Sequence, residues 1–280
     1  MKRLIQCLAI LLFLPLAATA QQQPTQLQQE LGKLVWQSGP SKGIVGVNAT
    51  ILIPQGYVFL DGTNTRKFLE LNGNPPQDNH YTIAPNNLKW FAILQFAETG
   101  YVKDDEKIDP DDLLKKLQQH DVSNNEERKR LGMPAMYTDG WVSPPHYDVQ
   151  TKRLEWGDQI HSESGRKLVN YTSRILGRTG VMSAVLVANP NTMEHDITEF
   201  KQALAGFSYN PGQTYSEFRQ GDKVAEYGLA ALILGGAAAV ATKKGFWTVL
   251  IGAAVAFWKL IAGVALAALA GFKRIFKKKQ

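Results

Sequence analysis

The stretch at residues 167–188 reads KLVNYTSRILGRTGVMSAVLVA, and it predicts how the middle of this chain folds. Both halves are rich in Val, Ile, Thr and Leu, and β-branched residues favour strands. The link GRTG at residues 177–180 separates them, and a short glycine-bounded link between two apolar runs is typical of a β-hairpin. The stretch therefore predicts two antiparallel strands, 167–176 and 181–188.

Working outward from this hairpin, the sequence predicts further strands and a few helices. A strand at 153–161 precedes the hairpin, and a helix at 191–204 follows it. Sequence-adjacent strands with tight turns, together with separate helices, indicate an α+β domain built on an antiparallel sheet with a few packed helices. The earlier expected elements are strands within 43–54, 57–60 and 89–96, a helix at 65–71, and a helix from 109 to about 132 with a second start at Ser123 and Glu126.

The positive charge of the chain lies at its two ends. The formal net charge is +6, yet all 25 acidic residues fall between residues 21 and 228. Eight basic residues and no acidic residue follow Gly228. The body is therefore mildly acidic, which argues against a basic groove for nucleic acid, and we expect no nucleic-acid partner.

The N-terminus has the pattern of a secretory signal peptide over residues 1–20. Lys2 and Arg3 precede an apolar run, and Ala18-Thr19-Ala20 is a small-x-small cleavage site. The single cysteine, Cys7, lies inside this peptide. Cleavage would leave an exported α+β domain at 21–221 without disulfides, thiolate zinc sites or a cysteine nucleophile.

Residues 222–272 are predicted to form a membrane-embedded helical region, followed by a basic tail at 273–280. An uncharged run covers 227–242, and a longer apolar run covers 246–272. The basic tail favours the cytoplasmic side, and an exported domain then requires an odd number of crossings. We expect one crossing, with the other segment interfacial or half-inserted, and the lipid bilayer is the first partner expected.

Small residues recur at four-residue spacing in both apolar runs, which allows helix backbones to approach closely in lipid. This pattern indicates helix packing within the chain or a homo-oligomer. Lys259 is a charge inside the second run, where it either has a function or reaches to the lipid headgroups. The spaced small residues are Ala231, Gly235, Ala239, Gly263, Ala267 and Gly271.

The candidates for catalysis are His146, Asp148 and His161. His146 and Asp148 share one face if they lie on a strand, so the carboxylate could orient the imidazole. Pro144 and Pro145 precede them, and the pair also fits a structural turn. No serine or cysteine nucleophile motif accompanies them, and the turn is the favoured interpretation.

Metal and cofactor signals are weak along the whole chain. The five histidines form no i, i+4 pair, although ligands from distant segments could still converge. The acidic run at 104–112 lacks the alternating pattern of a calcium loop and fits a solvated helix start. We expect neither a cofactor nor a resident metal.

Eight stretches in order resemble the bacterial domain-of-unknown-function family 2167, whose members are uncharacterised membrane-anchored proteins. The resemblance implies a Gram-negative envelope location and a C-terminal membrane region, and it carries over no catalytic residue. The succession of hairpin, helix and GFSYNP is also similar to small exported domains of the PsbP/Mog1 kind. The stretches are IPQGYVFL, LNGNPP, GYVKDD, NNEERKRLG, GWVSPPHYD, VNYTSRILGRTGV, FSYNPGQTYSEF and DKVAEYGLAAL.

Together these features predict an inner-membrane protein whose main domain lies in the periplasm and binds a protein or envelope component without catalysis. One alternative is a membrane-tethered hydrolase or metal-dependent enzyme using His146 and Asp148. The other is a scaffold that assembles through its membrane helices. The charge distribution and the weak catalytic signals favour the first.

Overall fold

The computed structural model describes residues 26–72, 76–130, 134–165, 167–188 and 190–235. Its centre is an eight-stranded sheet in which each pair of neighbouring strands is antiparallel. This confirms the predicted α+β class. The strand order is β1 (Gln37–Ser38), β4 (Tyr57–Leu60), β5 (His80–Pro85), β6 (Phe91–Ala97), β10 (Val181–Val187), β9 (Lys167–Leu176), β8 (Arg153–Ser162) and β7 (Met136–Asp148).

The predicted hairpin forms the middle of this sheet. β9 and β10 pair over seven residues each, and the Gly177 amide donates to the Gly180 carbonyl at 2.8 Å to close the turn. A Cβ at Gly180 would lie 2.1 Å from the Ala97 carbonyl oxygen of β6, so the turn needs a residue without a side chain. The hairpin therefore fits closely against the next strand.

A second sheet of three strands packs beside the first. Its order is β11 (Phe207–Tyr209), β3 (Ala49–Ile53) and β2 (Ser41–Val45). β2 and β3 form the hairpin expected within 43–54, whereas β11 comes from more than 150 residues later in the chain. The small sheet thus joins the beginning of the domain to its end.

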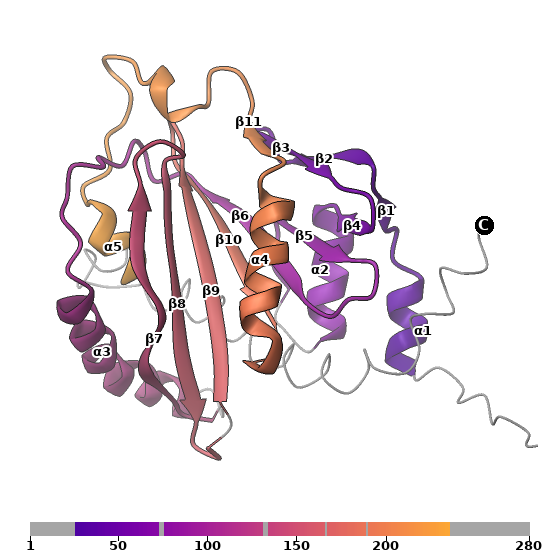
Figure 1. Cartoon of the computed structure of the whole chain (residues 1–280), viewed down its shortest axis with the longest axis horizontal. Helices are drawn as coiled ribbons and strands as arrows, with labels where there is room; N and C mark the ends of the chain where they lie inside the picture. Colours follow the sequence, from indigo (N-terminus) through magenta and orange to yellow (C-terminus); the bar gives the residue numbers. More distant parts are fainter. Residues whose placement is uncertain (1–25, 73–75, 131–133, 166, 189, 236–280) are drawn as a thin grey trace, which may run out of the picture.

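Helix α4 (Met193–Leu204) covers one face of the large sheet and lies in front of it in Figure 1. Phe200 of α4 is fully buried against Trp90, with their ring centroids 6.2 Å apart and perpendicular. The same cluster includes Ile51 of the small sheet and Tyr171 of β9. One hydrophobic core therefore holds α4 and both sheets together.

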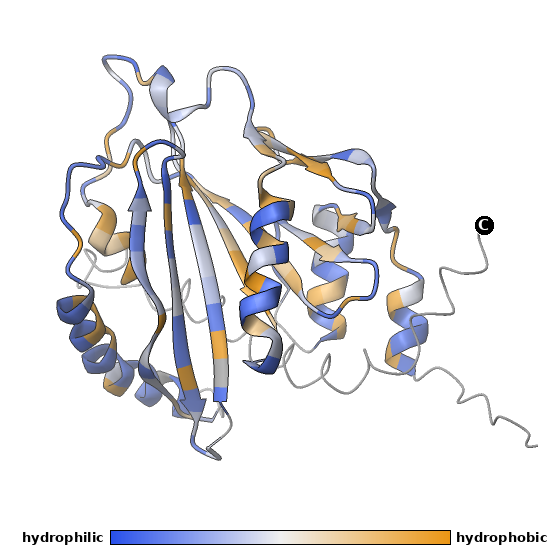
Figure 2. Ribbon diagram, viewed as in Figure 1, coloured by the Kyte–Doolittle hydropathy of each residue, from blue (hydrophilic) through white to orange (hydrophobic). Residues whose placement is uncertain are grey.

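The opposite face of the large sheet carries two separate hydrophobic clusters. Helix α2 (Gly62–Leu71) buries Phe68 and Leu69 over the β4–β6 end. Helix α5 (Leu229–Ile233) buries Leu229 and Leu232 against Trp156 at the β8 end. Helix α3 (Pro110–Arg130) lies along β7 and is largely hydrophilic (Figure 2). The remaining helical pieces are α1 (Gln26–Gly32), η1 (Pro190–Thr192) and η2 (Tyr215–Glu217).

Three expectations differ from the structure in detail. Helix α2 begins three residues earlier than predicted, because the Asp61 carboxylate accepts from the Asn64 amide at 2.8 Å and caps it. Helix α3 does not restart at Ser123, whose hydroxyl donates instead to the His120 carbonyl within the helix. The Pro144-Pro145 segment belongs to β7, an edge strand with register shifts, where proline is tolerated.

The folded domain continues past residue 221, where the sequence placed its end. The Tyr101 amide donates to the Lys223 carbonyl at 2.8 Å, and α5 then packs on the sheet. Across the residues that the structure describes, no helix is both long and apolar enough to cross a bilayer. Ala231 and Gly235 belong to the described part of the chain, whereas Ala239, Lys259, Gly263, Ala267 and Gly271 lie outside it.

Candidate functional site

The structure places His146 and Asp148 near the end of the edge strand β7. The His146 side chain is exposed, and His146 pairs in register with Glu155 of β8. The Asp148 carboxylate accepts from the amides of Gln150 and Thr151 at 2.8 and 3.2 Å. A hydrogen bond from the Thr151 side chain has the largest effect, and with these two amide bonds it holds the pKa of Asp148 below its ordinary value. Asp148 thus shapes the turn between β7 and β8.

His161 lies toward the other end of the same strands. Its Nδ1 contacts Asp139 Oδ1 at 2.5 Å, and its ring stacks on Tyr137 at 5.2 Å between centroids. His161 lies six positions along β8 from Glu155, the residue opposite His146, and this corresponds to about 20 Å along a strand. The two histidines share a sheet face but are not brought together.

A cleft lies between the β7–β8 turn, the end of β9, β11 and the segment that follows β11. The β7–β8 turn is at the upper end of the sheet in Figure 1. The volume of the cleft is about 320 Å³, and four separate segments line it. Ile175, Phe207 and Tyr209 contribute apolar surface to its lining, and the remaining lining includes charged and hydroxyl side chains. The lining residues are Gln150, Thr151, Lys152, Arg153, Ile175, Leu176, Phe207, Ser208, Tyr209, Thr214, Tyr215 and Ser216.

One wall of the cleft is built around the carboxylate of Asp104. Lys152 Nζ lies 2.8 Å and the Tyr147 hydroxyl 2.7 Å from Asp104 Oδ2. Burial tends to raise the pKa of Asp104, but the bonds from Lys152 and Tyr147 outweigh it and keep the pKa below its ordinary value. Lys152 also lies over the Tyr215 ring, 5.0 Å from its centroid. The charge of Lys152 is thus already balanced.

Arg153 is the second cation that lines the cleft, and its bonding differs. Its Nη2 donates to the Leu204 carbonyl at the end of α4, at 3.0 Å. The nearby carboxylate of Glu155 is held instead by Lys201 at 2.8 Å. Asp148 is likewise engaged in its turn, so the half-buried Arg153 guanidinium has a neutral carbonyl as its hydrogen-bond partner within the described chain. Burial lowers the pKa of Arg153, although an arginine remains charged at neutral pH.

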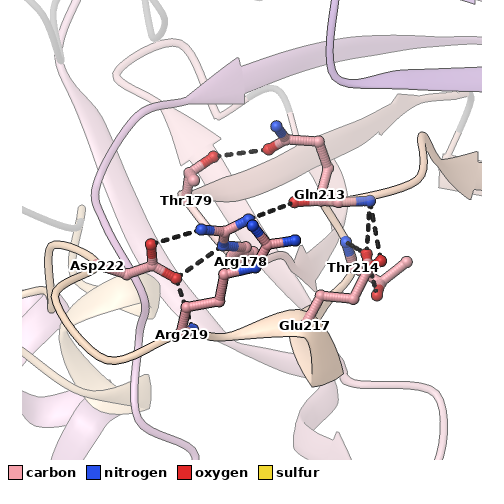
Figure 3. A network of polar contacts seen from close by, with 8 residues as sticks. Arg178, Thr179, Gln213, Thr214, Glu217, Arg219 and Asp222 are labelled. Carbon is pink, nitrogen blue, oxygen red and sulfur yellow. Dashed lines mark hydrogen bonds and ion pairs between the residues drawn. The ribbon is translucent and has the colours of Figure 1, made fainter.

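The segment from 212 to 222 is held in place beside the cleft by the network in Figure 3. Arg178 of the hairpin turn binds Asp222 through two nitrogens, and Thr179 donates to the Gln213 side chain at 2.9 Å. Glu217 accepts from the amides of Gly212 and Thr214 and from the Thr214 hydroxyl. These contacts fix the wall that carries Thr214, Tyr215 and Ser216.

Metal ligands do not gather within the described ranges, where no group of three His, Asp or Glu side chains is placed to hold an ion. The acidic residues at 104–112 have other partners. Asp104 contacts Lys152, Asp109 caps α3 through the Asp111 and Asp112 amides, and Asp112 contacts Lys116. Asp104, Asp109 and Asp112 are thus engaged in contacts within the fold.

The family model described as "Protein of unknown function (DUF2167)" matches residues 37–270. The chain belongs to this family. Among solved structures, the fold is similar to the solution structure of cyanobacterial PsbP (CyanoP) from Synechocystis sp. PCC 6803, with 9% identity and a TM-score of 0.36. The match covers 63% of this chain and 94% of that one. No curated protein matches the sequence.

Little in the local sequence predicts the cleft. Its walls come from residues 150–153, 175–176, 207–209 and 214–216, which only the folded chain brings together. The adjacent cations Lys152 and Arg153 follow directly on the stretch that holds His146 and Asp148. Lys152 in the turn and Arg153 at the start of β8 are a local signal for a binding surface at this place.

Proposed function

We propose that this protein is a membrane-anchored envelope protein whose exported domain binds a partner through the cleft, without catalysing a reaction. The cleft is the observation that carries the proposal, because its lining combines apolar and charged side chains on segments that are held in place. The signal-peptide pattern at 1–20 and the apolar, lysine-bearing sequence after residue 235 support the location in the inner membrane, with the domain in the periplasm.

Recognition accounts for the cleft better than acid–base chemistry does. Burial and the neighbouring Asp104 raise the pKa of the Tyr147 hydroxyl, and burial together with Tyr101 and Asp104 raises that of Tyr215, so both remain protonated donors. The Thr214 hydroxyl is engaged with Glu217. Tyr147 donates to Asp104 and Tyr215 to the Val102 carbonyl, so these groups hold the lining rigid and are not free acids or bases.

The binding part is tested by placing a photo-crosslinking residue at Ser216, in the cleft, in the full chain expressed in membranes. Lys67, on the surface of α2, is the control position. We expect one specific adduct from Ser216 and none from Lys67, and we expect the identified partner to bind the purified full chain in detergent. Equal adducts from both positions, or none from Ser216, would argue against a partner in the cleft.

The anchoring part is tested separately by alkaline carbonate extraction of membranes. The full chain should stay in the membrane pellet, whereas a variant truncated after Gly235 should be released into the supernatant. Release of the full chain by carbonate would contradict an integral anchor and leave the binding result unaffected.

A further inference from the structure

The strand β11 lies at the edge of the three-stranded sheet, and all three of its residues line the cleft. The hydrogen bonds between β11 and β3 determine which backbone N–H and C=O groups of β11 have no partner in β3. The Leu52 amide donates to the Gly206 carbonyl, and the Asn210 amide donates to the Asn48 carbonyl. Gly206, Ser208 and Asn210 therefore direct their backbone groups toward β3, since bonding alternates along an antiparallel strand.

Phe207 and Tyr209 then direct their amides and carbonyls to the opposite side, the free edge of β11. The register pairs Phe207 with Ile51 and Tyr209 with Ala49, the two pairs without mutual hydrogen bonds. In the described part of the chain, no other backbone or side-chain group bonds to these four. An unpaired strand edge is a template for an added strand.

Natural proteins commonly protect such edges, and the other edges of this molecule are protected. β7 carries Pro144 and Pro145 and three register shifts, and β1 has only two residues. β2, the other edge of the small sheet, carries the charge of Lys42, whose carbonyl also accepts from Gln37 Nε2 at 3.0 Å. β11 carries no proline, bulge or charge along its three residues. β11 is also short, but its three residues lie beside the cleft and carry none of the other protections, so this edge can accept a short added strand.

Arg153 indicates which charge a ligand at this edge should carry. The guanidinium lies on the rim of the same cleft and is bonded to the Leu204 carbonyl, with no carboxylate among its described hydrogen-bond partners. Glu155 and the cross-strand partner Asp148 interact with the Arg153 charge, but no hydrogen bond from Arg153 to either is found in the described chain. A ligand carboxylate would supply the charge-assisted bonds that this guanidinium lacks. The ligand should therefore be acidic close to the paired residues.

We propose that the cleft binds an extended acidic peptide segment of a partner protein, which adds as a strand to the free edge of β11 and places a carboxylate on Arg153. This inference rests on the proposed function and names the ligand class for the same site. Main-chain pairing to Phe207 and Tyr209 spans roughly 7 Å, at 3.3–3.4 Å per residue, so a short segment is sufficient. Arg153 then supplies the sequence preference.

The test is selection of a displayed library of random octapeptides on the full chain in nanodiscs. We expect the selected peptides to be rich in Val, Ile and Thr, with Asp or Glu at one fixed position. Arg153→Gln should weaken the best synthetic peptide at least tenfold, Arg153→Lys should restore part of the affinity, and Lys42→Gln, outside the cleft, should leave it unchanged. An amide analogue of the acidic side chain should bind Arg153→Gln and the natural chain equally.

N-methylation of single peptide amides tests the strand pairing itself. Methylation should abolish binding at alternate positions and have little effect at the positions between them, because only every second amide faces β11. A uniform response, or selected peptides without an acidic position, would overturn the inference.

Inorganic phosphate and phosphatidylglycerol vesicles serve as comparison probes. Binding of either that depends on Arg153, without any selected peptide, would replace the peptide by a small anion or a lipid headgroup. A specific adduct from Ser216 together with a failed peptide selection would overturn this inference and leave the proposed function standing. If neither the Ser216 crosslinking nor the peptide selection succeeds, both the proposed binding function and this inference are contradicted.

Discussion

Arg178 and Asp222 form a two-point ion pair across 44 residues of sequence: Nε and Nη2 of the arginine each donate to one carboxylate oxygen at 2.7 Å. Arg178 lies in the turn of the central hairpin, and Asp222 lies on the segment that leads to α5. The pair therefore connects the rigid middle of the sheet to the last described part of the chain. Since two parallel bonds also fix orientation, they position the wall of the cleft as well.

Asp222→Asn should loosen this segment. The amide cannot replace the two charge-assisted bonds, and residues 212–222 should open more often. Limited proteolysis of the segment is expected to become about tenfold faster, with cleavage elsewhere unchanged. Asp105→Asn, an exposed carboxylate outside the network, should behave like the natural chain. Unchanged cleavage in Asp222→Asn would mean that the other contacts in Figure 3 hold the segment alone.

The same pair predicts an acid-dependent effect. The hydrogen bonds from the Arg178 side chain and from the Arg219 amide lower the pKa of Asp222 from 3.8 to about 2, and the bond from Arg178 has the larger effect. A carboxylate with a lowered pKa in the folded state stabilises that state above pH 3.8, and the contribution is lost as the pH falls toward 2. The difference in unfolding midpoint between the natural chain and Asp222→Asn should therefore shrink over this window. A constant difference down to pH 2 would contradict the shift.

Tyr209 should stabilise the domain through its hydroxyl. The oxygen accepts from the Met182 amide at 2.9 Å and donates to the Ile175 carbonyl at 2.7 Å, so it bridges β9 and β10. Tyr209→Phe removes both bonds and should lower the free energy of unfolding by about 1–3 kcal/mol in urea denaturation. Tyr81→Phe is the matched control, because no hydrogen bond of the Tyr81 hydroxyl occurs in the described structure. Equal losses in the two variants would mean that the bridge contributes nothing.

The parts of the fold that the sequence predicted are those set by local pattern. The strands at 153–161, 167–176 and 181–188 agree with β8, β9 and β10 to within a residue at each end, because apolar alternation and glycine turns act over short distances. The helix at 191–204 corresponds to η1 and α4. Local reasoning was enough for these elements.

The remaining features depend on contacts between distant segments. β5 at 80–85 was not predicted, and β11 joins β3 across the length of the domain, a pairing that no local pattern contains. Pro144-Pro145 suggested a link, yet the edge position of β7 tolerates both prolines within a strand. The cleft was missed for the same reason as β11, because its walls meet only after both sheets have formed.

Arg174 should be replaceable by an apolar residue. Its Nε is buried without a hydrogen-bond partner in the described structure, and the guanidinium carbon lies 5.9 Å from the Trp156 ring centroid. Burial lowers the pKa of Arg174 to about 10, which shows that the charge is poorly compensated. Arg174→Met should therefore leave the free energy of unfolding unchanged or raise it by about 1–4 kcal/mol. Lys42→Met at the surface is the control, and a clear loss of stability in Arg174→Met would contradict the prediction.

Asp158 should make the stability of the domain depend on pH in the opposite direction from Asp222. Burial, together with the negative charge of Asp121, raises the pKa of Asp158 from 3.8 to about 6. The folded state then holds a proton that the unfolded state has released, so the contribution to stability is complete below pH 3.8 and is lost as the pH rises to 6. Asp158→Asn keeps the neutral form at every pH. Its free energy of unfolding should equal that of the natural chain at pH 4 and exceed it by up to about 3 kcal/mol at pH 7. Urea denaturation at both pH values measures this, and a difference independent of pH would show that Asp158 is ionised in the folded state throughout.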